Sequence, residues 1–427
     1  MWTPPPSSPR PTGNSVRPRF LSAGWLMPMD GPPIRNGSVL IGRDGRIEAI
    51  GQPGSILPRD GVEHESWPDA VILPGLVNTH THLELTGFAG MAEETDFSAW
   101  IRRIRTLKEG RTAADFLAAA RQGLADCHAA GVTTVADTGD SGAVIEALAE
   151  VGGSGIAYHE VFGPHPDQVT ESMAGLRQRV ADLRRFTSER VRLGVSPHAP
   201  YTVSAALYRA VAEFAVQEQL PIAVHLAESE AESELVTGGG GPFAKAWSLR
   251  GIPLPDSSGA SPVAWLDAHG VLGPRTLAIH LVRAQAGDIA SLRRSHTSVA
   301  HCPLSNRRHG HGVAPIRDFL DAGLRVGVGT DSVASVGRLD LLAEARAART
   351  LAGLSAAEAL ALVTSGGAEA LGVHREVGSL QPGLWGDIAV VEVEQAGDEE
   401  EALESVLASR PGAVLETTIG GSVRYRR

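Results

Sequence analysis

The chain has 427 residues, of which 43% are hydrophobic and 20% are charged, and its net charge is −11. This length suits one large domain with a small companion, and the negative charge argues against nucleic acid or an anionic membrane as the main partner. Two cysteines, Cys127 and Cys302, cannot form a disulfide framework, and no stretch approaches the roughly 20 apolar residues of a membrane span. We therefore expect a cytoplasmic protein that acts on a small molecule, and a homodimer is possible.

Both ends of the chain are expected to differ from its middle. Residues 1–17 are rich in Pro, Ser and Arg and are predicted to be a disordered lead. Residues 18–70 combine short apolar runs with turn signals such as Asn36-Gly37, and residues 376–427 contain further strand-like runs. We predict that these two segments pair into one small β-sandwich domain.

Between the two ends, apolar β-branched segments alternate with longer Ala-rich amphipathic ones. The helical patterns include 115–130, 205–219 and 314–322. Eight such strand–helix units favour an α/β fold, a (β/α)₈ TIM barrel over residues 71–375. Reactive polar residues stand at the C-terminal ends of most of these strands, where active sites of this architecture lie. The expected strands are 70–82, 131–138, 155–162, 191–198, 221–228, 276–280, 297–303 and 325–332.

The motif His80-Thr-His82 indicates a metal site. Alternate residues of a strand point the same way, so His80 and His82 project side by side, as two imidazoles on one metal ion must. The other candidate ligands, His225 and Asp331, also lie at strand ends, and imidazole with carboxylate suits zinc or iron. Such a set leaves a position for water, whose pKa zinc lowers to about 7, and Asp331 could also accept a proton from that water. The sequence predicts one divalent metal ion, with Zn²⁺ as the first expectation and Fe²⁺ as the second.

Two further residues are candidates for moving protons. His280, at the sixth strand end, could be another ligand or could polarise the nascent hydroxide. Glu228, just after the fifth strand, could carry a proton from water to the leaving nitrogen. The structural alternative for Glu228 is a helix cap, beside a solvated acidic face formed by Glu230, Glu232 and Glu234.

These motifs resemble those of the amidohydrolase superfamily. The resemblance covers nearly the whole chain. Within the superfamily, the chain is most similar to the mononuclear deaminase and chlorohydrolase branch, which includes S-adenosylhomocysteine/methylthioadenosine deaminases and triazine hydrolases. Segments 83–86, 96–103 and 238–243 are similar to the aminodeoxyfutalosine deaminases. The matching segments of the branch are 74–82, 197–201, 225–229, 279–280, 299–306, 329–332 and 378–391.

The resemblance implies the ligands and proton carriers named above, and it adds substrate contacts. His198 would be the counterpart of a ribose-contacting histidine, and His301 and Ser335 would also touch substrate. A structural role is the alternative for His198 and for His301, which could hold the seventh loop. Binuclear relatives carry a lysine at the fourth strand. Here Lys108 and Lys245 are the only lysines and lie in helical or loop context, so a single metal is expected.

Other residues near the strand ends keep two interpretations. Trp100 is predicted to line the wall of the substrate pocket, and the alternative is that it packs in the hydrophobic core. Glu160 stands where relatives acting on adenosylhomocysteine place an arginine, which argues against an amino-acid carboxylate on the substrate. His309 and His311 lie in a Gly-rich loop, where substrate contact or solvent exposure is expected rather than metal binding. Arg307 in the same loop is expected to face an anionic or polar substrate group, or solvent.

The pattern predicts a metal-dependent hydrolytic deaminase of an aminated heterocycle. The expected substrate is an adenine-type nucleoside of the aminodeoxyfutalosine, methylthioadenosine or adenosylhomocysteine class, with release of ammonia. One alternative is an amidohydrolase or chlorohydrolase acting on a cyclic amide, guanine or a triazine, and another is a non-catalytic relative. The zinc cytidine deaminases share the reaction but not the signature, because the chain has no Pro-Cys-x-x-Cys.

Overall fold

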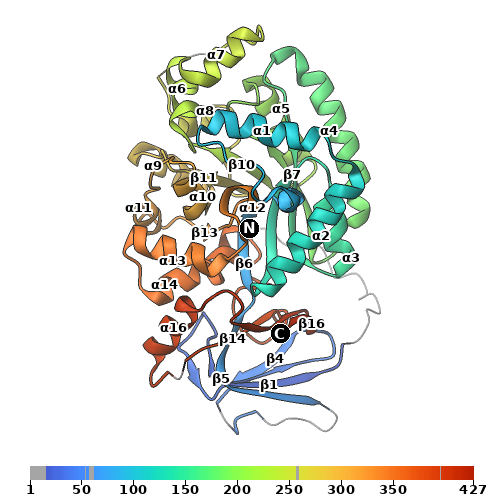
Figure 1. Ribbon diagram of the computed structural model, residues 1–427, viewed down its shortest axis with the longest axis vertical. Coiled ribbons are helices and arrows are strands. Elements are labelled where there is room, and N and C mark those ends of the chain that lie inside the picture. The colour runs from blue at the N-terminus through green and yellow to red at the C-terminus, as the bar shows by residue number, and fades with distance from the viewer. Residues whose placement is uncertain (1–15, 53, 57–61, 256–258, 395) are drawn as a thin grey trace.

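The structure, a computed structural model, describes residues 16–427 apart from 53, 57–61, 256–258 and 395. Within those residues the strands form a barrel and a separate sheet built from both ends of the chain. Figure 1 shows the terminal sheet at the bottom and the barrel with its helices above it. The lead expected over residues 1–17 falls almost entirely outside the described residues.

The barrel consists of parallel strands that follow one another in chain order. Its first and last strands meet through a parallel bridge between Thr81 and Asp331, which closes the ring. This arrangement confirms the predicted (β/α)₈ barrel. The barrel strands in the described part of the chain are β6 (Leu76–Thr81), β7 (Val132–Gly139), β8 (Ser154–Val161), β9 (Val191–Pro197), β10 (Ile222–Leu226), β11 (Thr276–His280), β12 (Ser298–His301) and β13 (Val326–Val328).

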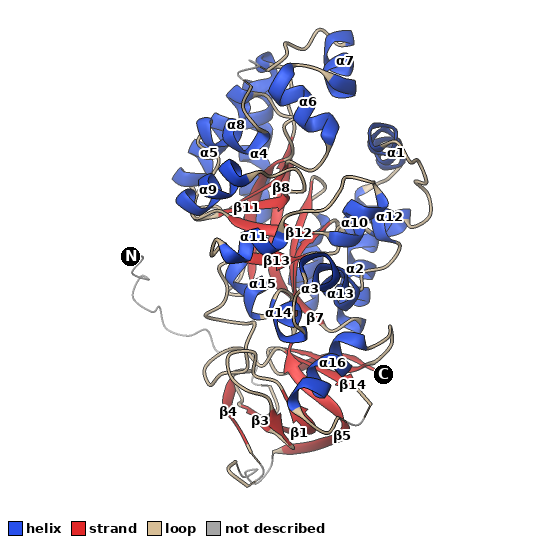
Figure 2. Cartoon of the chain, turned by 90° about the vertical axis from the view of Figure 1, so that its left-hand side faces the viewer, coloured by secondary structure: helices blue, strands red, loops and turns tan. Residues whose placement is uncertain are grey.

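Helices connect the barrel strands and surround them (Figure 2). The patterns at 115–130, 205–219 and 314–322 correspond to α2 (Ala113–Ala129), α5 (Ala205–Gln217) and α11 (Ile316–Asp321). Helix α2 starts at a capping box, in which the Thr112 hydroxyl accepts from Asp115 N and the Asp115 carboxylate accepts from Thr112 N. The α-helices of the described residues are α1 (Phe97–Glu109), α2 (Ala113–Ala129), α3 (Ala143–Val151), α4 (Val169–Leu183), α5 (Ala205–Gln217), α6 (Glu230–Gly238), α7 (Gly241–Leu249), α8 (Pro262–Ala268), α9 (Ala286–Ser295), α10 (Pro303–Arg308), α11 (Ile316–Asp321), α12 (Val333–Val336), α13 (Leu341–Ala352), α14 (Ala356–Ala361), α15 (Ser365–Ala370) and α16 (Glu399–Ala408).

The terminal sheet joins the two ends of the chain, as predicted. Its strands are β1 (Arg19–Leu26), β2 (Ile34–Arg35), β3 (Ser38–Ile41), β4 (Ile47–Gly51), β5 (Glu63–Pro74), β14 (Ile388–Glu392), β15 (Val414–Ile419) and β16 (Ser422–Arg426). β5 pairs in parallel with β1 and antiparallel with β14, so strands from both ends of the chain are hydrogen-bonded into one sheet.

The strand expected over 70–82 is divided between the two sheets. β5 ends at Pro74 in the terminal sheet, and β6 begins at Leu76 in the barrel. Gly75 separates them and has no room for a side chain, because a Cβ there would lie 2.2 Å from side-chain atoms of Thr133. The exact domain limits stay predictions.

Apolar side chains fill the barrel interior below the site. Val77, Ile156 and Ile279 from the strands pack with Ala368 of α15 and with Leu371. The polar strand ends therefore lie above a layer of packed apolar side chains. Helix α1 lies on the side of the barrel away from the terminal sheet (Figure 1). No helix in the described part of the chain has the length and apolar character needed to cross a membrane.

Candidate active site

The predicted metal ligands converge at the C-terminal ends of β6, β10 and β13. The Nε2 atoms of His82 and His225 are 3.3 Å apart, and Asp331 Oδ1 lies 3.7 Å from His82 Nε2 and 3.9 Å from His80 Nε2. Ligands at about 2.1 Å from a tetrahedral cation lie about 3.4 Å from one another, which these distances approach. The ligand atoms of His80, His225 and His280 also fall within 4.8 Å of one another. The structure thus brings the predicted ligand set together, with His280 beside it.

Hydrogen bonds leave the lone pairs of these imidazoles available for a cation. His82 Nδ1 donates to the carbonyl of Thr138 at 2.8 Å, and His225 Nδ1 donates to the carbonyl of His198 at 3.2 Å. Each neutral ring therefore presents an unprotonated Nε2. Both ring nitrogens of His80 are buried without a hydrogen-bond partner among the described residues. Orphaned polar atoms are costly unless a ligand satisfies them, so the donor set fits a divalent metal ion.

The electrostatics of the cluster favour neutral imidazoles. Burial lowers the pKa of His80 well below its ordinary value. Burial also lowers the pKa values of His82 and His225 to about 4. Burial raises the pKa of Asp331, an effect that His280 opposes and that a bound cation would oppose further. Metal binding requires deprotonated ligands, and the histidines already have this form at neutral pH.

The backbone at these strand ends adopts conformations that side chains rarely take. Ala227, His280 and Asp331 have φ angles of 50°, 74° and 59°. A left-handed backbone costs a non-glycine residue roughly 1–2 kcal/mol, and such strain clusters at functional sites. Gly329 approaches the first strand so closely that a Cβ there would lie 2.5 Å from His80 N. The chain just after β13 therefore packs closely against β6 beside His80.

Glu228 lies between two imidazoles. His280 Nε2 and His311 Nε2 are 3.4 Å and 3.5 Å from Glu228 Oε1. Burial alone would raise the pKa of Glu228, but the neighbouring imidazoles of His280 and His311 outweigh burial and hold the pKa of Glu228 below its ordinary value. Glu228 is thus an ionised, buried carboxylate beside the ligand cluster.

Glu232 supports Glu228 from below. The backbone N–H groups of Ala227 and Glu228 donate to separate oxygens of Glu232, at 2.8 Å and 2.9 Å. Glu232 is completely buried, so the solvated acidic face predicted for this residue is wrong. Its position at the third residue of α6 turns its side chain back toward the strand end instead of toward solvent.

The cluster opens into a cavity of about 850 Å³. Helix α1 covers one side of it through Phe97 and Trp100, which places Trp100 on the predicted pocket wall. Lys108 Nζ, farther along α1, pairs with the buried Glu84 at 2.7 Å and so ties the helix to the barrel. Glu160 also lines the cavity.

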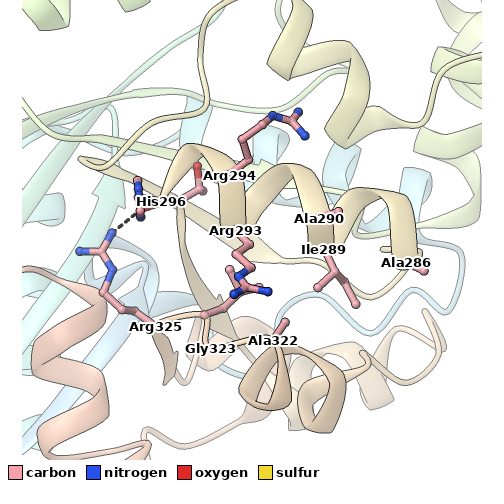
Figure 3. Close-up of a pocket in the computed structure, with 11 residues that line it drawn as sticks. Ala286, Ile289, Ala290, Arg293, Arg294, His296, Ala322, Gly323 and Arg325 are labelled. Carbon is pink, nitrogen blue, oxygen red and sulfur yellow. Dashed lines mark hydrogen bonds between the residues drawn. The ribbon is translucent and has the colours of Figure 1, made fainter.

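Another cavity, of about 760 Å³, lies between α9 and the turn after α11 (Figure 3). In it the Arg325 guanidinium donates to the carbonyl of His296, which caps the C-terminal end of α9. The described residues around this cavity include neither a carboxylate nor a pair of histidines. The cavity at the strand ends is therefore the candidate active site.

The comparisons with known proteins agree with this geometry. A model of the amidohydrolase family matches residues 71–424. The chain belongs to the amidohydrolase family. It is 32% identical to a 5-methylthioadenosine/S-adenosylhomocysteine deaminase of Moorella thermoacetica, over 94% of this chain and 92% of that enzyme. It is 34% identical to an aminodeoxyfutalosine deaminase of Deinococcus radiodurans, over 76% of this chain and 78% of that enzyme.

A solved structure shows the same fold. The adenosine deaminase from Xanthomonas campestris with bound zinc has a TM-score of 0.83 and 23% identity, over 95% of this chain and 92% of that one. This likeness shows that the two chains share one fold, a barrel with a terminal sheet.

Within this amidohydrolase, two residues expected to touch substrate lie behind the cavity wall. His301 Nδ1 donates to the carbonyl of His280 at 2.9 Å, and Ser335 Oγ lies 3.2 Å from His309 Nε2. Neither is among the residues that line the cavity, and each contacts a neighbouring histidine; substrate contact by His301 and Ser335 stays a prediction. Arg307 is exposed and does not line the cavity either.

The second barrel strand supplies supporting residues that were not predicted. Asp137 Oδ2 accepts from the Thr81 hydroxyl at 2.9 Å and from Leu83 N at 2.7 Å, so it holds the chain on both sides of His82. Thr138 contributes the carbonyl that orients the His82 ring. The signal that could have identified Asp137 is its place at a strand end, which it shares with the ligands.

Proposed function

We propose that this amidohydrolase is a metal-dependent hydrolytic deaminase that converts an adenine-type nucleoside to its oxo product and releases ammonia. The observation that carries this proposal is that the ligand cluster and the ionised Glu228 face one cavity. The relatives from Moorella thermoacetica and Deinococcus radiodurans are both named deaminases, which supports the reaction class.

The metal site of the proposal uses the residues at the strand ends. His80, His82, His225 and Asp331 would hold one divalent cation, Zn²⁺ first and Fe²⁺ second, because neutral imidazoles with a carboxylate suit both ions. When bound, the cation supplies Lewis-acid activation of a water molecule. The zinc in the Xanthomonas campestris structure supports this assignment.

Glu228 and Asp331 move the two protons of the attacking water. Glu228 takes one proton and passes it to the ring nitrogen next to the carbon that bears the amino group. Asp331 takes the second proton, which ends on the amino group, so that the carbon–nitrogen bond breaks and ammonia leaves as the carbon–oxygen double bond forms. His280, 3.4 Å from Glu228, keeps that carboxylate and the water aligned.

The far wall of the cavity suits a sugar hydroxyl. The Thr202 hydroxyl donates to a backbone carbonyl at 3.1 Å, so it accepts from His198 Nδ1–H at 2.8 Å and leaves His198 Nε2 as an acceptor. Glu160 Oε1 lies 4.0 Å from that nitrogen and has no hydrogen-bond partner among the described residues. We expect a ribose hydroxyl between His198 and Glu160, with Trp100 offering an aromatic face to the base.

A substrate panel tests the proposal. Ammonia and chloride release would be measured with adenosine, methylthioadenosine, adenosylhomocysteine, aminodeoxyfutalosine, guanine and a chlorotriazine, with Glu228→Gln as the inactive control. We expect ammonia from one or more of the adenine nucleosides. Chloride release, or ammonia from guanine alone, would replace the proposal with the alternative hydrolase.

We also propose a cytoplasmic location and, as the assembly to be tested, a homodimer. Cell fractionation tests the location. Size-exclusion chromatography with light scattering gives the mass in solution, to be compared with the 44.7 kDa of one chain.

A further inference from the structure

One histidine that the mechanism above does not use contacts its key carboxylate. His311 is buried, with 7% of its surface exposed, and its Nε2 lies 3.5 Å from Glu228 Oε1 without forming a regular hydrogen bond to any described residue. Because an unpaired polar atom in the interior is costly, a shift of a few tenths of an ångström that pairs the two groups is favourable. The imidazole is therefore placed to donate to Glu228.

The loop after α10 fixes the position of His311. The backbone N–H of His311 donates to the carbonyl of Asn306 at 3.0 Å, just past the end of α10. Gly310, with φ of 67°, allows the reversal that turns the chain back over the site. Phe97 of α1 packs edge-on against the imidazole, with ring centroids 4.5 Å apart. The end of α10, the turn at Gly310 and the contact with α1 together restrict the conformations that the His311 side chain can adopt.

We propose that His311 is a positioning residue for Glu228. The Nε2–H of His311 donates to Glu228 Oε1, the oxygen that also lies near His280 Nε2. The other oxygen, Glu228 Oε2, stays available to exchange protons with the substrate. His309, by contrast, lines the cavity, whereas His311 does not, so His311 acts through Glu228. The proposal rests on the proposed function, because it gives Glu228 the proton-transfer role.

Kinetics of three variants test the proposal. His311→Ala should lower kcat about 10- to 100-fold, the usual effect of losing a partner that orients a reactive group, with little change in KM. His311→Gln places an amide N–H near the lost Nε2 and should recover most of kcat, and added imidazole should partly restore His311→Ala. The exposed His374→Ala serves as the matched control. A kcat for His311→Ala within twofold of the control, or a change in KM alone, would overturn the proposal.

A spectroscopic measurement separates this inference from the proposed function. The ¹⁵N signal of His311 Nε2, identified by its loss in His311→Gln, should shift in Glu228→Gln but not in Glu230→Gln, since Glu230 is exposed and pairs with Arg283. This readout needs no turnover. If the signal shifts as expected and the wild-type protein deaminates nothing, the contact stands and the proposed function fails. An unmoved signal in Glu228→Gln would refute the contact itself.

Discussion

Replacing Glu232 by glutamine tests how the site is supported. The two oxygens of Glu232 accept the backbone N–H groups of Ala227 and Glu228 at 2.8 Å and 2.9 Å in a fully buried position. Glutamine has an NH₂ group in place of one oxygen, so one of these N–H groups would face another donor. A buried donor left unsatisfied costs about 1–3 kcal/mol, and the left-handed backbone of Ala227 loses one of its restraints.

We expect Glu232→Gln to lower the melting temperature and kcat together, because the turn that it holds also carries Glu228. Glu232→Ala removes both acceptors and should destabilise the protein by about 2–6 kcal/mol, twice the cost of one lost partner. Calorimetry on the zinc-saturated protein and ammonia release measure the two effects. Glu234→Gln, exposed on the same helix, is the matched control. A Glu232→Gln variant as stable and as active as the control would show that these hydrogen bonds do not place Glu228.

Three further predictions concern the ligands and their packing. His82→Ala should lose bound metal and activity together, whereas Glu228→Gln should keep the metal and lose about 10²- to 10⁴-fold in kcat. Metal analysis beside the ammonia assay separates the two effects. Unchanged turnover in Glu228→Gln would remove Glu228 from the mechanism. Gly329→Ala should lower the melting temperature, because its Cβ would meet His80 N at 2.5 Å, and an unchanged melting temperature would mean that the strands can separate. In protein freed of metal by a chelator, the free energy of unfolding should fall as the pH drops below about 6.5. Folding lowers the pKa values of His80 and His225, so the unfolded chain binds more protons than the folded one in this range. A melting temperature that stays constant between about pH 7 and 5 would contradict this prediction.

The convergence of the candidate ligands could be predicted from the sequence because two regularities determine it. The two-residue period of a strand puts His80 and His82 on one side, and a parallel barrel brings the ends of all its strands to one face. His225 and Asp331 follow from the second regularity alone. The division of the first strand at Gly75 could not be predicted, because the apolar run continues across it and only packing on Thr133 reveals the break.

The supporting residues escaped prediction for a different reason. Glu230, Glu232 and Glu234 look alike in the sequence, and only the position of the α6 N-cap at Ser229 decides that Glu232 faces inward. The contact between His311 and Glu228 likewise depends on a loop closing over the site, which no periodicity encodes. Residue type and spacing identify ligands on regular strands, whereas support from loops and helix ends requires the three-dimensional structure.

Stoichiometric reconstitution tests the central claim most directly. Metal-free protein would be titrated with Zn²⁺ while ammonia release from the best substrate of the panel is followed. We predict that the rate rises in proportion to added zinc and stops rising at about one equivalent per chain, as expected for a catalytic site with a single bound ion. Full activity in the metal-free protein, or a rate that keeps rising to a second equivalent, would contradict a single cation held at the strand ends.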